Sequence, residues 1–350
     1  MASPAARATL VMMAGVGTGA FRRVTGATVA FKPMPLSPFQ PHRLHGVDRT
    51  WTETNCYLDL WIEVLHSLDL DAVAAGACTL SADFEGDQWR FLKYPPEDLR
   101  ALYGIDVAEM AIWRPLIEHV LDQLSRGRLL TVEVDAFWLP DTAGVSYREV
   151  HTKTTIVPQS LEPDAATLGY FHNAGYFQLA GEDFDGVFGL GAHEDATALV
   201  PYVELLRFDD LRRDRADLVT RAVVLAHEHL ERRPPDNPVG RLGQAIVADL
   251  AWLRSVELET FHSYAFAMVR QCGVTAELAA DFVAWLTEHD VAHLTDAEAN
   301  FRAVATGAKT VQFQLARFVR GRTVDIETPL ERLADQWAAA MHEVVAWHES

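Results

Sequence analysis

Along the second half of the chain, apolar residues recur every three or four positions, the spacing of one face of an α-helix. The prolines of the segment ERRPPDNP interrupt this pattern, because proline lacks the backbone donor and clashes with the preceding turn. The pattern predicts helices over residues 215–232, 239–271, 275–289, 296–319 and 328–348. We therefore expect residues 192–350 to form an all-helical domain.

The first half of the chain has a mixed pattern. From Cys56 onward, apolar side chains fall on one helical face, whereas the segment RLLTVEVDAFWLP alternates as a strand does and ends at a proline. The pattern predicts helices over 56–68 and 107–124, and strands over 128–140, 153–158 and 168–173. We expect an α+β domain over residues 42–191, preceded by an N-terminal extension over residues 1–41.

Composition and charge narrow the classes of function. Hydrophobic residues make up 49% of the 350 residues, enough for a substantial core, and the formal net charge is −19. A chain this acidic is repelled by the phosphates of nucleic acid and by an anionic membrane surface, and we expect neither as a partner. No apolar run is long enough to cross a bilayer. Three cysteines do not form a disulfide framework, which favours a cytoplasmic location.

The position of Cys56 raises the first chemical question. This cysteine stands where a polar run, TWTETN, turns into the predicted helix. A helix N-terminus favours thiolate over thiol, so Cys56 is a candidate nucleophile. The alternative is that Cys56 is a small apolar residue at a helix start.

A cysteine nucleophile needs a base and a group that orients the base. His151, at the entry to a predicted strand, is the leading candidate for the base, and Asn173, after the next strand, could accept a hydrogen bond from the His151 ring. His172 is an alternative base, although strand alternation points it away from Asn173. Asn55 could supply an oxyanion donor beside the Cys56 amide. The alternative is that these residues are only polar groups at strand ends.

Acidic segments near these positions are candidate substrate-binding elements. The segment DFEGDQWRFLK resembles a pocket rim, and the segment VDAFWLPDT ends a predicted strand near the presumed site. Their candidate residues for binding a substrate amine are Glu85, Asp87, Gln88, Trp89, Asp135 and Asp141. The alternative for each segment is a solvated acidic loop. We expect no metal and no cofactor, because the chain has no CxxC or zinc-ligand spacing.

The order of Cys56, His151 and Asn173 along the chain resembles that of papain-like cysteine enzymes. Four segments together resemble an uncharacterised bacterial family known as a domain of unknown function: HRLHGVDRTWTETNCYLDLWIEVLH, DFEGDQWRFLKYP, VDAFWLPDTAGVSYREVHTKTTI and GYFHNAGYFQLAGEDFDGVF. A more distant resemblance is to the butirosin side-chain acyltransferase. It implies a papain-like, cysteine-peptidase-like N-terminal domain joined to an all-helical C-terminal domain. Thr50 departs from this pattern, because papain-like peptidases commonly carry an oxyanion-hole glutamine six residues before the cysteine.

The resemblance implies a cysteine-dependent acyltransferase or thioesterase that moves an aminoacyl or acyl group from an acyl carrier protein to a small-molecule amine or to water. The helical half offers a basic segment, KTVQFQLARFVRGR, for docking the carrier. Its cations are Lys309, Arg317, Arg320 and Arg322. Two alternatives stay open: a cysteine peptidase or amidase, and a non-catalytic papain-like protein that docks a carrier protein or ligase.

Overall fold

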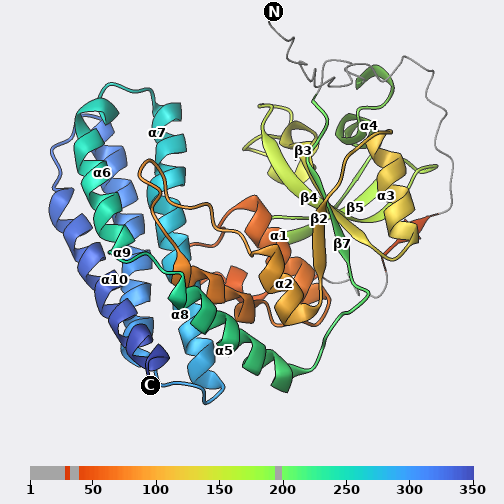
Figure 1. The fold of residues 1–350 in the computed structure, drawn as a ribbon. Helices are drawn as coiled ribbons and strands as arrows, with labels where there is room; N and C mark the ends of the chain where they lie inside the picture. The colour runs from red at the N-terminus through yellow and green to blue at the C-terminus, as the bar shows by residue number, and fades with distance from the viewer. Residues whose placement is uncertain (1–27, 32–38, 194–198) are drawn as a thin grey trace, which may run out of the picture.

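The computed structural model describes residues 28–31, 39–193 and 199–350. Most of the predicted N-terminal extension lies outside these residues. The chain has a sheet-containing region and a helical region, which stand side by side (Figure 1). This arrangement confirms an α+β first half and a helical second half.

Seven antiparallel strands form the sheet in the described residues, in the order β2-β7-β3-β4-β5-β6, with β1 paired to β4. The strands are β1 (Val29–Ala30), β2 (Asp106–Glu109), β3 (Leu129–Asp135), β4 (Lys153–Glu162), β5 (Thr167–His172), β6 (Gly175–Ala180) and β7 (Val203–Arg207). Because β7 pairs with both β2 and β3, the sheet region extends beyond the predicted boundary at residue 191, to about residue 208.

Helices cover the sheet on both sides. The helix α1 (Cys56–Ser67) packs against β4 and β5 on the side that faces the helical region, and α3 (Leu116–Ser125) packs against β3 and β4 on the side away from it (Figure 1). Nine of the twelve residues of α1 are buried, so this helix is the centre of the molecule rather than a surface helix. The helix α4 (Glu182–Phe188) lies beside β6.

The segment after α1 is a ten-residue 3₁₀ helix, η2 (Ala72–Ser81), which is long for this type of helix. It packs against α5 (Arg215–Glu231) and α8 (Gln271–Glu288), and its small side chains allow the close approach. The helix α2 (Pro96–Tyr103) follows and contacts both η2 and α5.

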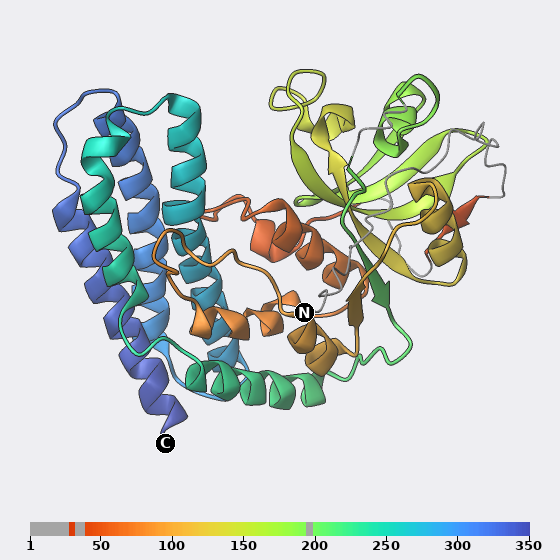
Figure 2. The same cartoon turned by 45° about the horizontal axis from the view of Figure 1, so that its top comes forward.

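The helical region continues with α6 (Pro238–Leu253), α7 (Leu258–Ala265), α9 (Thr295–Val319) and α10 (Glu327–His348). Figure 2 shows these helices as a bundle beside the sheet region. A π-helical turn, η6 (Phe266–Arg270), joins α7 to α8. Among the helices that the structure describes, none has the length and apolarity needed to cross a membrane.

Two predicted helices differ from the structure. The helix predicted over 107–124 is strand β2 followed by α3, with Pro115 at the start of the helix. The helix predicted over 239–271 is divided into α6, α7 and the π turn. The 3₁₀ helices η1 (Arg43–His45), η3 (Ala136–Trp138), η4 (Pro140–Thr142) and η5 (Gly191–His193) fill connections between the larger elements.

Candidate functional site

Cys56 is the first residue of α1 and is partly exposed, whereas Cys78 and Cys272 are buried. Burial raises the pKa of both buried thiols far above the ordinary value of a cysteine. Cys56 is therefore the cysteine that solvent can reach. The position at a helix start was predicted correctly.

Asn55 is the N-cap of α1. Its side-chain oxygen accepts a hydrogen bond from the Leu58 amide at 2.9 Å, and its Nδ2 donates to the Leu92 carbonyl at 2.9 Å. Both polar ends of this side chain are thus used within the protein, and Asn55 is buried. The predicted role of its side chain as an oxyanion donor is corrected to a helix cap.

The helical region holds the chain just before Cys56. The Arg270 guanidinium, in the π turn, donates to the carbonyls of Thr54 at 3.1 Å and Glu53 at 2.8 Å. The neighbouring Gln271 accepts a hydrogen bond from the Leu92 amide at 3.1 Å. π turns are frequent at functional sites. This one, together with the first residue of α8, holds the chain just before Cys56 and the Leu92 segment to which Asn55 also bonds.

A buried carboxylate, Glu204 on β7, lies beneath the first turn of α1. It accepts hydrogen bonds from Tyr57 at 2.5 Å, Thr131 at 2.9 Å, Lys93 at 2.8 Å and Tyr202 at 3.0 Å. Burial opposes its ionisation, but the Lys93 charge and the donated hydrogen bonds outweigh burial and lower the pKa of Glu204. Burial and Glu204 together raise the pKa of Tyr202 to about 12.

Sequence reasoning missed this cluster. The available signal was an acidic residue inside the apolar run VELLR, because such a residue on a buried strand requires partners. The strand itself was not predicted, so the acid received no role.

His151 lies just before β4 with its Nδ1 at 2.5 Å from Asp135 Oδ2. Its ring stacks on Phe137, with the centroids 4.3 Å apart and the planes at 13°. A carboxylate can only accept, so Nδ1 carries the proton and Nε2 is left as the basic nitrogen. The predicted partner of the ring was Asn173; the structure corrects this to Asp135, which was itself predicted to bind substrate.

Asn173 is the first residue of the two-residue turn between β5 and β6, with His172 and Gly175 paired on either side. Its φ is 46°, a left-handed conformation that asparagine tolerates better than most residues. Its role in the structure is therefore that of a turn residue, and it makes no hydrogen bond to His151.

The contacts of Tyr57 and His151 with strand residues, read with strand alternation, place the start of α1 and His151 on the same side of the sheet. Glu204, which Tyr57 contacts, pairs with Thr131, and residues directly opposite each other point to the same face. Asp135 follows Thr131 by four positions along β3, so its side chain also points to that face. His151 and Cys56 are not hydrogen-bonded to each other in the structure, which leaves the His151 Nε2 without a partner among the described residues.

His172 and Asp141 form a separate, buried pair on the opposite face. His172 Nδ1 donates to Asp141 at 2.5 Å, Nε2 accepts from Thr154 at 2.8 Å, and Tyr170 also donates to Asp141. Thr154 pairs with Val134, which points away from the face of Asp135. The prediction that Asp141 binds a substrate amine is wrong, because its carboxylate is buried and committed, and His172 cannot serve Cys56 from this face.

The four residues of the predicted pocket rim lie in different environments, three at the surface and one in the core. Glu85 forms an ion pair with Arg90 at 2.5 Å, and Asp87 and Gln88 are exposed beside it. Trp89 is 1% exposed and donates from Nε1 to Thr275 of α8 at 3.1 Å, so it belongs to the core and the prediction for this residue is corrected.

Of the four cations predicted to dock a carrier, one is bound within the protein and three are exposed. Lys309 donates to the Thr50 carbonyl and lies 5.4 Å from the Trp51 ring centroid, so it fastens the chain before α1. Arg317, Arg320 and Arg322 are exposed at the C-terminal end of α9. These three form the remaining basic patch.

In the described part of the chain, no group of three or more His, Cys, Asp or Glu side chains is placed to hold a metal ion.

Two family models match the chain: the DUF1839 N-terminal domain over residues 40–208 and the DUF1839 C-terminal domain over residues 215–346. The first match ends after β7, as the sheet does. No curated protein matches the chain at a significant level, so the resemblance to the butirosin side-chain acyltransferase stays a prediction.

Proposed function

The chain belongs to the DUF1839 family, and from the site described above we propose that it is a cysteine-dependent acyltransferase or thioesterase with a papain-like sheet region. One observation carries the proposal: the accessible Cys56 begins the central helix on the same sheet face as the His151–Asp135 pair. A nucleophile, a base and an orienting carboxylate are the parts that such chemistry needs.

In the proposed reaction, the Cys56 thiolate attacks the carbonyl carbon of an acyl thioester. The bond from this carbon to the carrier sulfur breaks, and the carrier thiol takes the proton that His151 Nε2 removed from Cys56. An amine or water then attacks the acyl-enzyme and gives its proton to His151, which returns it to Cys56. Asp135 holds the ring so that Nε2 is the nitrogen that moves the proton.

The first turn of α1 supports the negative charge that develops on the carbonyl oxygen. Its N–H groups point out of the helix end, and the Asn55 side chain satisfies only that of Leu58. A thioester has a better leaving group than a peptide bond, so its cleavage depends less on acid assistance. This difference favours acyl transfer over peptide cleavage.

His151 must approach Cys56 for this reaction. Its side chain is 70% exposed, and the neighbouring Val150 is exposed as well, so the segment before β4 is open to solvent. Catalytic hydrogen bonds are often longer in ligand-free structures and tighten when substrate binds. We propose that substrate binding brings the His151 ring within hydrogen-bonding distance of the Cys56 thiol.

An acyl carrier protein is the donor we propose, with Arg317, Arg320 and Arg322 as its docking patch. Exposed arginines that follow one another closely along this acidic chain can attract an acidic partner. Transfer from a carrier should therefore weaken with salt, whereas transfer from a small thioester should not.

The test is intact-protein mass spectrometry after exposure to an aminoacyl thioester, either on a carrier protein or on N-acetylcysteamine. The wild type should gain one acyl group, and Cys56→Ala should gain none. His151→Gln should acylate about 10²-fold more slowly or worse, as is typical for loss of a general base. Asp135→Asn should slow acylation, because the ring loses the partner that fixes its tautomer.

Asn173→Gly is the matched control, because glycine keeps the left-handed turn and removes the amide. It should acylate at close to the wild-type rate. Acylation of Cys56→Ala, or the absence of any covalent adduct in the wild type, would overturn the proposal. Faster cleavage of a peptide amide than of the thioester would assign the chain to the peptidases instead.

A further inference from the structure

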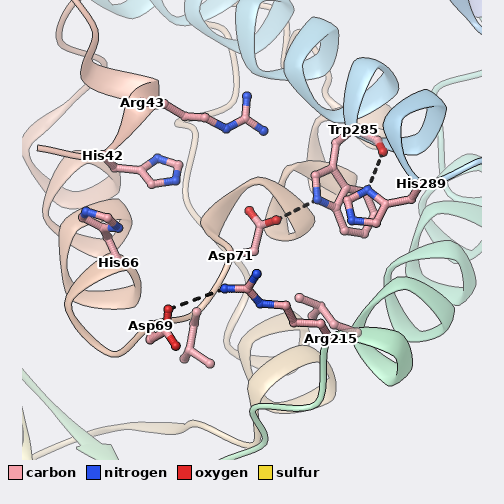
Figure 3. Close-up of a pocket in the computed structure, with 10 residues that line it drawn as sticks. His42, Arg43, His66, Asp69, Asp71, Arg215, Trp285 and His289 are labelled. Atoms are coloured by element: carbon pink, nitrogen blue, oxygen red, sulfur yellow. Dashed lines mark hydrogen bonds and ion pairs between the residues drawn. The ribbon is translucent and has the colours of Figure 1, made fainter.

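A cavity of about 400 Å³ lies at the end of α1 opposite Cys56, between the sheet region and the helical region. Its walls come from η1, the end of α1, the turn before η2, the start of α5 and the end of α8 (Figure 3). The polar residues that line it are His42, Arg43, His66, Asp69, Asp71, Arg215 and His289. Cavities of this size commonly hold small molecules.

Of the two carboxylates of the cavity, Asp71 is committed to protein partners and Asp69 is exposed. Asp71 accepts from Trp285 Nε1 at 2.8 Å with one oxygen and from the Val73 amide at 3.1 Å with the other. Asp69 lies 3.6 Å from Arg215 and is otherwise turned to solvent. Asp71 therefore offers no free acceptor to a ligand, and Asp69 competes with a ligand only for Arg215.

The hydrogen-bond donors that line the cavity have few partners within the protein. His42 is about nine-tenths buried, and its Nδ1 accepts from the Leu44 amide at 3.2 Å, so its proton lies on Nε2. That Nε2–H has no partner among the described residues, and Figure 3 shows the ring on the cavity wall. Arg43 and Arg215 have only long ion pairs, at 3.9 Å to Glu288 and 3.6 Å to Asp69.

The remaining lining is apolar or aromatic. Leu70, Leu218 and Trp285 are buried and line the cavity between the polar walls. The His289 ring packs on the Trp285 ring, with the centroids 4.2 Å apart, and its Nδ1 donates a hydrogen bond to the Trp285 backbone carbonyl at 2.8 Å. A ligand with an apolar body could cover this surface while its polar end meets the arginines.

We propose that this cavity binds a small organic anion, with a carboxylate or phosphate group held by Arg43, Arg215 and the His42 Nε2–H and an apolar body on Leu70 and Leu218. The two arginines stand on opposite walls of the cavity (Figure 3). Within a chain of net charge −19, the two lining arginines balance the two lining aspartates, so the cavity does not share the general acidity. The proposal does not depend on the chemistry of Cys56.

The test is isothermal titration calorimetry of the full chain with benzoate, phenyl phosphate and benzamide. Benzamide has the shape of benzoate without its charge, so it should bind at least about tenfold more weakly. Arg43→Gln and Arg215→Gln should each weaken binding of the preferred anion by about tenfold or more, which is the effect expected for one charge-assisted hydrogen bond.

Arg126→Gln is the matched control, because Arg126 is an exposed, ion-paired arginine at the C-cap of α3, outside the cavity. It should leave the affinity unchanged. A preference for benzoate would identify a carboxylate ligand, and a preference for phenyl phosphate a phosphate ester; either result supports the proposal. Equal binding of benzamide, no binding of either anion at about 10 mM, or affinity unchanged in both arginine variants would overturn it.

Discussion

At the scale of single residues, His45 lies in surroundings that favour its charged form. Its ring is buried between two carboxylates of α1, with Nδ1 at 2.5 Å from Glu63 and Nε2 at 3.2 Å from Asp59. Burial opposes protonation, but the two carboxylates outweigh burial and raise the pKa of His45 to about 9. Because Asp59 also binds the Thr54 amide at 2.9 Å, the charged ring supports the chain that leads to Cys56.

The His45 charge predicts a fall in stability at alkaline pH. The folded-state pKa of about 9 lies above the ordinary value of 6.5, so the contribution is complete below pH 6.5 and is lost as pH rises to about 9. The loss should be on the order of 3 kcal/mol in the free energy of unfolding, since one pKa unit corresponds to about 1.4 kcal/mol. Urea denaturation at pH 6 to 9 measures it.

The His45→Gln variant separates this contribution from others. It should be less stable by about 3–5 kcal/mol at neutral pH, because two buried carboxylates lose their cation. Its stability should also depend less on pH between 6.5 and 9. His342→Gln, on α10, serves as the control. An unchanged alkaline slope in the His45 variant would contradict the assignment.

The sequence revealed single residues better than their partners. Cys56 was placed correctly because a polar run followed by helical periodicity marks a helix start. The role of His151 as a base stays a prediction, and its hydrogen-bond partner was not foreseen, because the Asp135–His151 contact depends on the register of β3 against β4. Spacing along a chain does not specify that register.

At the scale of elements, the long helices were predictable and the short ones were not. The helix predicted over 215–232 is Arg215–Glu231, because its 3.6-residue periodicity persists for several turns. Strands β6 and β7 were missed because each spans only six or five residues without clear alternation. A ten-residue 3₁₀ helix such as η2 has no periodic signal that separates it from a buried α-helix.

Two glycines in helices predict opposite responses to alanine. A Cβ on Gly273 of α8 would lie 2.7 Å from the Trp51 ring, so Gly273→Ala should lower the free energy of unfolding by about 1–3 kcal/mol. On Gly240 of α6 the nearest atoms lie 3.8 Å away, so Gly240→Ala should raise it by about 0.5–1 kcal/mol. Chemical denaturation of both variants checks the pair, and equal effects would argue against the packing of Trp51 on α8.

At the scale of the whole molecule, the two family domains are joined through a buried interface. Glu277 of α8 accepts from the amides of Thr50 at 2.8 Å and Trp51 at 2.9 Å, and Arg49 pairs with Asp281 at 2.6 Å. Trp89 reaches the same helix. Separation of the two domains would break these contacts and expose aromatic and charged side chains that are now buried.

The interface predicts that the two regions unfold together. Differential scanning calorimetry should show one transition, with calorimetric and van't Hoff enthalpies that agree. Residues 40–208 expressed alone should lack a cooperative transition, because Trp51 and Trp89 lose their partners on α8. Two separate transitions in the full chain would contradict this prediction.

The π turn has a consequence for how the length of this chain can vary. A π turn is one residue wider than an α turn, and each helical residue advances the face by about 100°. Losing one residue between 266 and 270 would therefore rotate α8 against α7. Gln271, Thr275 and Glu277 would then turn away from Leu92, Trp89 and Trp51. In family members that keep these contacts, the stretch from α7 to α8 should tolerate substitutions but not a change in length.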